Sequence, residues 1–341
     1  MTKGVVRTVL GDIRPEDLGP TLLHEHVLCD IRPPAWRCEP ITGYDIALND
    51  RFAIDYGETN APGNLILNQV DVAAAELQRM ASAGGRAIVD LSCGGLSPDP
   101  KGLVRAARQA GVHVIMGCGW YVEEYLEPSI TDRTVDDLAS EMISQVKCGA
   151  WGTDVKAGIL GEIGCQAPWT PTERKVMEAA AIAMKETGAS LSVHPGRDAD
   201  QPQEVAEFLA ARGADLGRVI ISHIDRTIFD DDRLLRLADT GVVLEFDLFG
   251  METTFYKLSD IDMPNDGARV KTLSLLKSRG HLERIAISHD ICYRSRLQCF
   301  GGHGYGHIFR NVIPLMLRRD FSATDIEQIL VHTPARLLTL Q

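Results

Sequence analysis

Two histidines separated by one residue, His24 and His26 in the run LLHEHVL, have the type and spacing that suit metal binding. Residues two apart on a β-strand leave the same face, so both imidazoles can reach one ion while Glu25 between them points away. Imidazole nitrogen is a common ligand of zinc and similar ions. An isolated His-x-His is more often an ordinary hydrogen-bonded pair than a ligand pair, so the motif needs support from other residues.

Further candidate ligands lie at or near the ends of other aliphatic runs. His194 ends SLSVH, His223 lies in VIISHID, and Asp290 lies in IAISHDI. Each alone is typical of a hydrogen-bonded residue at the rim of a sheet. Burying several titratable groups together is costly unless their charges are compensated, so their arrival at one rim favours a metal centre. Glu162 in GILGEIGC is placed to bridge two ions, although it could instead pair with a lysine or arginine.

These residues depend on a repeating pattern of strand-like runs and amphipathic helical stretches. The helical stretch 171–187, for example, is preceded by Thr170, a good N-cap, and followed by Gly188, a good stop. Strands that alternate with helices predict parallel pairing. The eight runs predicted as strands are 22–28, 86–92, 113–118, 157–163, 190–194, 219–225, 242–248 and 285–291.

Eight strand and helix units favour a closed α/β barrel, the (β/α)8 or TIM barrel. An open doubly wound sheet is the alternative, but its usual G-x-G-x-x-G turn after the first strand is absent from the sequence. Barrel enzymes assemble their sites at the C-terminal ends of the strands, where the candidate ligands fall. No interdomain linker is visible, so residues 1–341 are expected to form a single metal-dependent hydrolase domain.

Two loops interrupt the repeat. Residues 31–64, rich in Pro, Gly, Asn and Asp, form a long connection after the first strand, and we expect them to cap the barrel mouth. Residues 298–307, QCFGGHGYGH, follow the last strand and offer His303, Tyr305 and His307 as residues that line the pocket.

Composition narrows the class of partner. The net charge is −12, and we find no clustered basic surface of the kind that nucleic-acid binding needs. No apolar run approaches the roughly 18 residues of a membrane span, and the N-terminus MTKGVVRTVL lacks a signal-peptide pattern. We therefore expect a cytoplasmic protein that acts on a small molecule, without a nucleic-acid or membrane partner.

The order of the candidate ligands resembles the phosphotriesterase family of the amidohydrolase superfamily. The similarity extends over TLLHEHVL, AGILGEIGC, HPGR, SHIDRTI, EFDLFG, DIDMP and GGHGYGHI, and the branch it most resembles is the phosphotriesterase-related proteins, once described as resiniferatoxin-binding proteins. Two divalent ions are implied, with zinc the expected metal. The implied ligands are His24, His26 and Asp290 for the buried ion, His194 and His223 for the exposed ion, and Glu162 for both.

The chain departs from the classical phosphotriesterases at the bridging residue. Those enzymes use a carbamylated lysine, with which Gly161 aligns, and Glu162 is its neighbour. An offset of one residue turns a side chain to the other face of an ideal strand, so a bulge or local twist is expected there. Arg226 replaces an acid of the classical proton relay, and Glu245 and Asp247 stand where those enzymes carry a histidine.

The resemblance implies a hydroxide shared by the two ions as nucleophile, with Asp290 shuttling its proton to the leaving group. Tyr121 either donates to the developing oxyanion or packs at the rim. Arg197 and Arg226 either bind an anionic group of the substrate or pair with carboxylates of the rim. The expected substrate is an anionic ester, lactone or N-acyl amide.

Other functions stay open at this point. Phosphotriester hydrolysis is one, because phosphoryl and carbonyl centres need the same ions. A barrel that binds a ligand with little catalysis is another, although a binder has no need of Asp290 in an intact ligand set. A one-metal deaminase would leave Glu162 without a role. Family members often form dimers, so the resemblance also allows for a homodimer.

Overall fold

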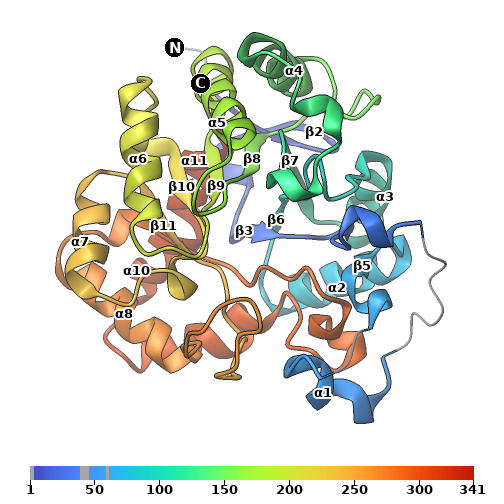
Figure 1. Ribbon diagram of the computed structural model, residues 1–341. Helices are drawn as coiled ribbons and strands as arrows, with labels where there is room; N and C mark the ends of the chain where they lie inside the picture. The colour runs from blue at the N-terminus through green and yellow to red at the C-terminus, as the bar shows by residue number, and fades with distance from the viewer. Residues whose placement is uncertain (1–3, 39–45, 59–60) are drawn as a thin grey trace.

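The computed structural model describes residues 4–38, 46–58 and 61–341. Parallel strands form one sheet of eight, in the order β12-β11-β10-β9-β8-β7-β6-β3. Hydrogen bonds from the His26 amide to the Ile291 carbonyl (3.3 Å) and from the Asp290 amide to the His24 carbonyl (3.2 Å) join the two edges beyond the strands. The sheet is therefore a nearly closed barrel, and the helices surround it (Figure 1). The predicted (β/α)8 architecture is confirmed.

The barrel strands are β3 (Thr21–Glu25), β6 (Ala87–Asp90), β7 (His113–Cys118), β8 (Ile159–Gly164), β9 (Leu191–His194), β10 (Val219–Ile221), β11 (Val243–Phe246) and β12 (Ile285–Ile287). The other strands are β1 (Val5–Thr8), β2 (Gly11–Ile13), β4 (Cys29–Asp30), β5 (Ile66–Leu67) and β13 (Thr339–Leu340). The helices are α1 (Arg51–Asp55), α2 (Val70–Ala83), α3 (Pro100–Ala110), α4 (Val135–Lys147), α5 (Pro171–Thr187), α6 (Gln201–Ala211), α7 (Asp231–Asp239), α8 (Asp266–Ser278), α9 (Ile313–Leu317), α10 (Ala323–Glu327) and α11 (Thr333–Leu338).

Each predicted run overlaps a barrel strand, but several strands end earlier than predicted. The runs 219–225 and 285–291 were too long, because β10 ends at Ile221 and β12 at Ile287. His223 and Asp290 have left-handed φ angles of 56° and 49°, which a regular strand cannot contain. The chain therefore leaves the sheet just where these two side chains are needed.

Alternation of side chains along the strands builds two apolar layers. One cluster contains Val89, Ile115, Ile220 and Val243 from inside the barrel. Residues of α11 such as Leu337 belong to the same cluster and close the barrel at one end. The larger cluster lies between the outer face of the strands and the helices. Further along β11, Glu245 and Asp247 share the face of Val243, so the polar centre continues directly from the apolar interior.

Local capping explains where the longest helix begins and ends. Helix α5 runs from Pro171 to Thr187 as predicted, and Thr170 and Glu173 form a capping box at its start. Gly188 ends it with a φ of 69°, a conformation that suits glycine.

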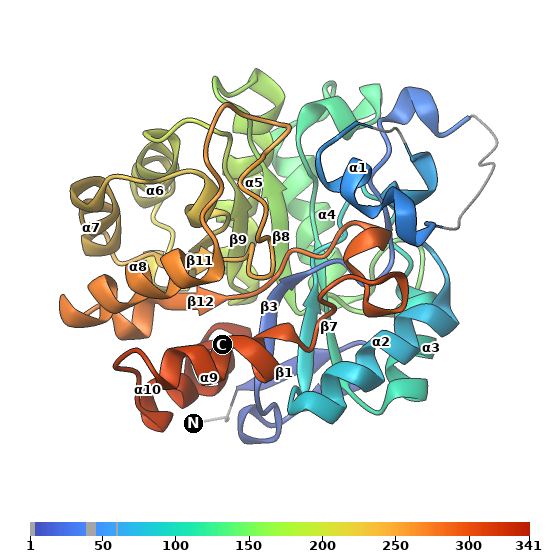
Figure 2. The same ribbon diagram turned by 90° about the horizontal axis from the view of Figure 1, so that it is seen from below.

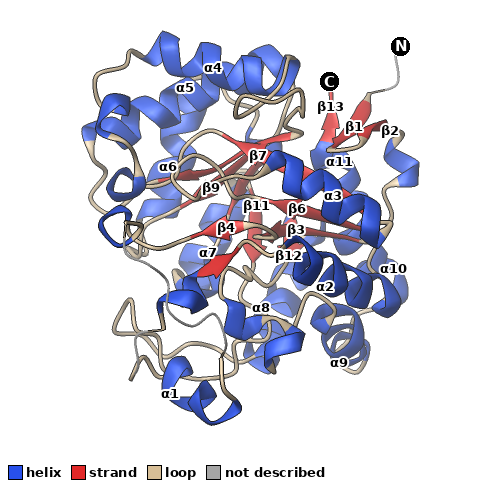
Figure 3. Ribbon diagram, turned by 90° about the vertical axis from the view of Figure 1, so that its right-hand side faces the viewer, coloured by secondary structure: helices blue, strands red, loops and turns tan. Residues whose placement is uncertain are grey.

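The two ends of the barrel differ. The small antiparallel sheet β13-β1-β2 lies at the N-terminal ends of the barrel strands, at the upper right of Figure 3. Helix α1, from the predicted capping loop, lies at the opposite end (Figure 2). Residues 39–45 and 59–60 of that loop lie outside the described residues. No helix among the described residues is long and apolar enough to cross a membrane.

Candidate active site

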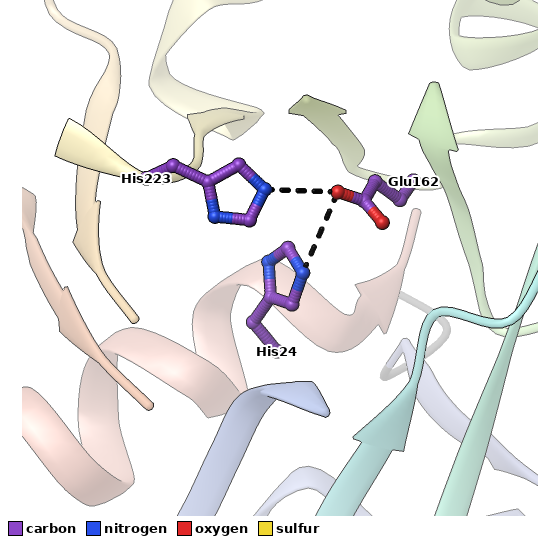
Figure 4. Close-up of side chains that lie close together, drawn as sticks. All are labelled: His24, Glu162 and His223. Carbon is purple, nitrogen blue, oxygen red and sulfur yellow. Dashed lines mark hydrogen bonds and ion pairs between the residues drawn. The ribbon is translucent and has the colours of Figure 1, made fainter. Parts of the chain in front are cut away.

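The six predicted ligands meet at the C-terminal end of the barrel around the Glu162 carboxylate. Its Oε2 lies 2.5 Å from His194 Nδ1, 3.0 Å from His223 Nε2 and 3.6 Å from His24 Nε2. Figure 4 shows the carboxylate between the rings of His24 and His223. The other oxygen, Oε1, lies 3.6 Å from His26 Nε2. Asp290 Oδ1 completes the group, 3.3 Å from His26 Nε2 and 3.7 Å from His24 Nε2.

The expected irregularity in β8 is present and brings Glu162 inward. Leu160 pairs with Leu191 and Ile163 with Val193, so the register shifts between them. Gly161 has a φ of 114°, and a Cβ there would lie 2.3 Å from the Ser192 carbonyl oxygen. Only glycine fits this position, and the bulge that it permits turns the next side chain toward the imidazoles.

The donor set fits divalent metal ions. Ligand atoms of His24, Glu162 and His223 lie within 4.8 Å of one another, as do those of His24, His26 and Asp290. The Nε2 atom of His24 is buried and has no hydrogen-bond partner, although unpartnered buried nitrogens are rare. A mixture of imidazoles and carboxylates in this number suits zinc and similar ions.

Burial and mutual contact shift the protonation of these groups strongly. Burial alone would raise the pKa of Glu162, but the imidazoles of His194 and His24 hold the pKa of the carboxyl well below its usual range. Burial likewise opposes ionisation of Asp290, yet the hydrogen bond from His26 and the neighbouring histidines lower its pKa to about 2. Burial, together with the Arg226 charge, lowers the pKa of His194 to about 4. Both carboxylates are thus ionised and His194 is neutral at pH 7, the states that metal binding requires. Burial opposes protonation of His24 and His26, but the neighbouring carboxylates outweigh it and raise the pKa of both rings, so these two imidazoles would release a proton when a metal ion binds.

A cavity of about 640 Å³ opens above this group. The described part of the predicted capping loop supplies some of its wall, including Ile31, Arg51 and Asn64. The loop after β11 and the segment after β12 supply other parts, so the mouth is built from connections between strands and helices. Residues of both kinds, charged and apolar, face the same space.

Three predicted substrate contacts lie in this wall: Tyr121, Arg197 and Arg226. The Tyr121 hydroxyl lies 3.4 Å from each ring nitrogen of His194, and burial raises the pKa of Tyr121 well above its usual value, so it stays a donor. Arg226 is buried and donates to the Pro195 carbonyl at 3.0 Å. Arg197 is exposed and donates to the Tyr256 hydroxyl at 3.2 Å.

The predicted contacts from 298–307 need two corrections. His303 lines the cavity. Tyr305, predicted to line it as well, is fully buried behind the wall, where its hydroxyl donates to the His26 carbonyl at 2.8 Å. His307 also lies outside the cavity lining and bonds to Asp266 at 2.6 Å. The left-handed Gly304 turns the chain between His303 and Tyr305, so neighbouring residues of one loop face different environments.

The family model described as the phosphotriesterase family matches residues 4–338. The chain belongs to the phosphotriesterase family. A curated relative, the N-acetyltaurine hydrolase of Xenopus tropicalis, is 40% identical over 344 residues that cover 99% of each chain. This similarity supports hydrolase activity for the present family member.

Solved structures agree with the family assignment. A resiniferatoxin-binding protein from Rhodobacter sphaeroides superposes with a TM-score of 0.91 at 31% identity, covering 98% of this chain and 95% of the other. A phosphotriesterase homology protein from Escherichia coli, complexed with phosphate in its active site, gives a TM-score of 0.79 at 28% identity, covering 95% and 99%. Both share the phosphotriesterase-family barrel with this chain.

Sequence reasoning missed two cations of this family member's cavity, Lys257 and Arg296. Lys257 Nζ lies 5.1 Å and Arg296 Cζ 4.9 Å from the centroid of the Tyr293 ring. Both come from loops, where no periodic pattern marks which side chains face the pocket. Their position after the seventh and eighth strands, on the active face of a barrel, was the one available signal.

Proposed function

We propose that this phosphotriesterase family member hydrolyses the amide bond of N-acetyltaurine or of a closely similar N-acyl amine that carries an anionic group, with two divalent ions, most simply zinc. The observation that carries the proposal is a set of cations in the cavity wall. Among the described residues, no carboxylate lies within ion-pair distance of Arg197, Arg226, Lys257 or Arg296. A substrate anion can therefore bind them without displacing a carboxylate partner.

In this proposal His24, His26 and Asp290 would hold one ion, His194 and His223 would hold the other, and Glu162 would be available to both. When bound, such ions polarise the scissile carbonyl and activate water as the nucleophile. The buried position of the group keeps competing solvent away from the reacting atoms.

Asp290 is suited to moving the proton. Its carboxylate is ionised at neutral pH because of its low pKa of about 2, and its side chain is 17% exposed, so it reaches the cavity. Hydrolysis adds OH to the acyl carbon and breaks the C–N bond. Asp290 takes the remaining proton of the water and returns it to the departing amine nitrogen, giving a carboxylic acid and the free amine.

The other cavity residues would orient the substrate. Tyr121 can donate its hydroxyl to the carbonyl oxygen as negative charge develops there. Arg226 lies deepest among the cations, with Nη2 3.4 Å from His194 Nε2, while Arg197 and Lys257 are exposed near the mouth. The sulfonate or carboxylate would thus sit on the side of Arg226 and the amide carbonyl beside Glu162.

The decisive experiment compares substrates that differ only in the charged group. On zinc-loaded protein, kcat/KM is measured for N-acetyltaurine, N-acetyl-β-alanine and the neutral N-acetylethanolamine, together with a lactone and paraoxon. We expect the sulfonate to exceed the neutral amide by about 100-fold, because one or two charge-assisted hydrogen bonds are lost with the charge. A faster reaction with the lactone or paraoxon, or equal rates with the neutral amide, would contradict the proposal. Binding of these compounds without turnover would instead favour a ligand-binding barrel.

A further inference from the structure

Asp247, directly after β11, contacts two candidate ligands that are far apart in the chain. Its Oδ1 lies 2.8 Å from His223 Nδ1, and its Oδ2 lies 3.2 Å from His24 Nδ1. Oδ2 also accepts a hydrogen bond of 2.9 Å from the His223 backbone amide. All three residues are buried, so water does not compete for these contacts.

These contacts determine which nitrogen of each ring faces the centre. An imidazole that binds a metal ion through one nitrogen carries its remaining proton on the other, and an acceptor beside Nδ1 keeps that proton on Nδ1. The lone pair then resides on Nε2. In both rings Nε2 points at Glu162, at 3.0 Å from His223 and 3.6 Å from His24. The Asp247 carboxylate thus turns the Nε2 lone pairs of both His24 and His223 toward Glu162.

We propose that Asp247 is a positioning residue shared by both metal ions, with one oxygen for the ligand of each. In the metal assignment above, His24 belongs to the buried ion and His223 to the exposed ion, so loss of this single carboxylate weakens both. The inference rests on the proposed two-ion centre. It also explains why an acid stands directly after β11, where the classical enzymes of the family carry a histidine.

Glu245 provides a matched control. Its Oε2 lies 3.3 Å from His24 Nδ1 and 3.1 Å from the Ser222 hydroxyl, which itself lies 3.1 Å from the same ring nitrogen. No contact joins Glu245 to His223 among the described residues. Both acids are buried on the same face of β11, so removing either charge perturbs the interior to a similar degree.

The test measures metal affinity rather than turnover. Full-length wild type, Asp247→Asn and Glu245→Gln are stripped of metal, checked for an unchanged circular dichroism spectrum, and titrated with zinc in competition with a chelating dye. We expect two ions on the wild type. Asp247→Asn should weaken both ions by about 10- to 100-fold each, whereas Glu245→Gln should weaken only one. Unchanged affinities in Asp247→Asn, or weakening of only one ion, would overturn the inference.

A measurement on the wild type keeps the inference testable if Asp247→Asn does not fold. Long-range ¹H–¹⁵N spectra of zinc-loaded protein labelled at histidine report which ring nitrogen carries the proton. His24 and His223 should both be protonated at Nδ1, and protonation of either at Nε2 would reject the role of Asp247. A wild type that binds fewer than two ions would instead reject the proposed metal centre itself, so the two failures are distinguishable.

Discussion

The inner end and the mouth of the same cavity are built in different ways. At the inner end, Glu162 and the four imidazoles come from strand ends and are buried, with contacts of about 3 Å to one another. At the mouth, Arg197 and Lys257 come from loops and are exposed. Strands supply a rigid frame for chemistry that any substrate requires, while loops that vary freely decide which substrate enters. Substitutions should therefore change turnover at the inner end and substrate preference at the mouth.

Removal of the ions should produce the largest effect. Dialysis against a strong chelator should abolish hydrolysis of N-acetyltaurine, a loss of about 10⁶-fold or more. Without the ions, only the side chains remain to polarise the scissile carbonyl and activate water. Activity and zinc content are measured together during titration with zinc, and activity should return in proportion to the second ion bound. Full activity with one ion per chain would favour a one-metal enzyme and leave Glu162 without its bridging role.

The substitution Asp290→Asn should have the next largest effect on activity. The amide keeps an oxygen for the ion but cannot accept the proton, so kcat should fall by about 10²- to 10⁴-fold while metal content changes little. Steady-state kinetics and metal analysis of the same preparation check this. An equal loss of metal and activity would show that Asp290 acts only as a ligand.

Arg226→Met tests the boundary between the two regions. It removes the deepest cation that has no ion pair among the described residues, so kcat/KM for N-acetyltaurine should fall by about 10- to 100-fold. N-acetylethanolamine serves as the control substrate, and its kcat/KM should stay within about threefold. Similar losses for both compounds would mean that Arg226 supports the fold around His194 rather than the substrate anion.

Lys257→Met should have a smaller effect that is confined to KM. The ammonium group is exposed and screened by water, so we expect KM for the anionic amide to rise by about two- to fivefold with kcat unchanged. Raising the ionic strength should reduce the difference between variant and wild type. A changed kcat would show that Lys257 acts on turnover as the inner-end residues do, and would contradict the division between mouth and inner end.

The smallest effect is expected on stability, for a substitution in a helix at the mouth. Phe52 of α1 is 66% exposed and stacks on Tyr56, so Phe52→Ala should change the free energy of unfolding by no more than about 0.5 kcal/mol. Leu244→Ala in the fully buried β11 is the matched substitution and should cost about 2–5 kcal/mol. Urea denaturation of both variants checks the pair. A large loss in Phe52→Ala would show that the capping segment is part of the stable frame.

Much of the inner end could be predicted from the sequence. His194, His223 and Asp290 each follow an aliphatic run, and parallel strands bring such positions to one edge. The bulge at Glu162 was also predictable, because the bridging acid was displaced by one residue from its aligned position. The single-domain organisation, the homodimer and the cytoplasmic location stay predictions.

The mouth could not be predicted to the same degree. Tyr305 and His303 are two residues apart in one loop, yet one is buried against the His26 carbonyl and the other lines the cavity. Lys257 and Arg296 are 39 positions apart in the sequence and meet at the Tyr293 ring only in the folded chain. Loop backbones follow no fixed period, so spacing in the sequence does not indicate the direction of a side chain.

The amino-acid sequence by itself determined the barrel and the set of candidate ligands, because hydrophobic periodicity defines strands and the ends of parallel strands must converge. The tertiary structure alone decided that Asp247 contacts two imidazoles and that four cations share one cavity without carboxylate partners among the described residues. Both of these facts depend on distances between residues of different strands and loops, and such distances exist only after the chain has closed into a barrel.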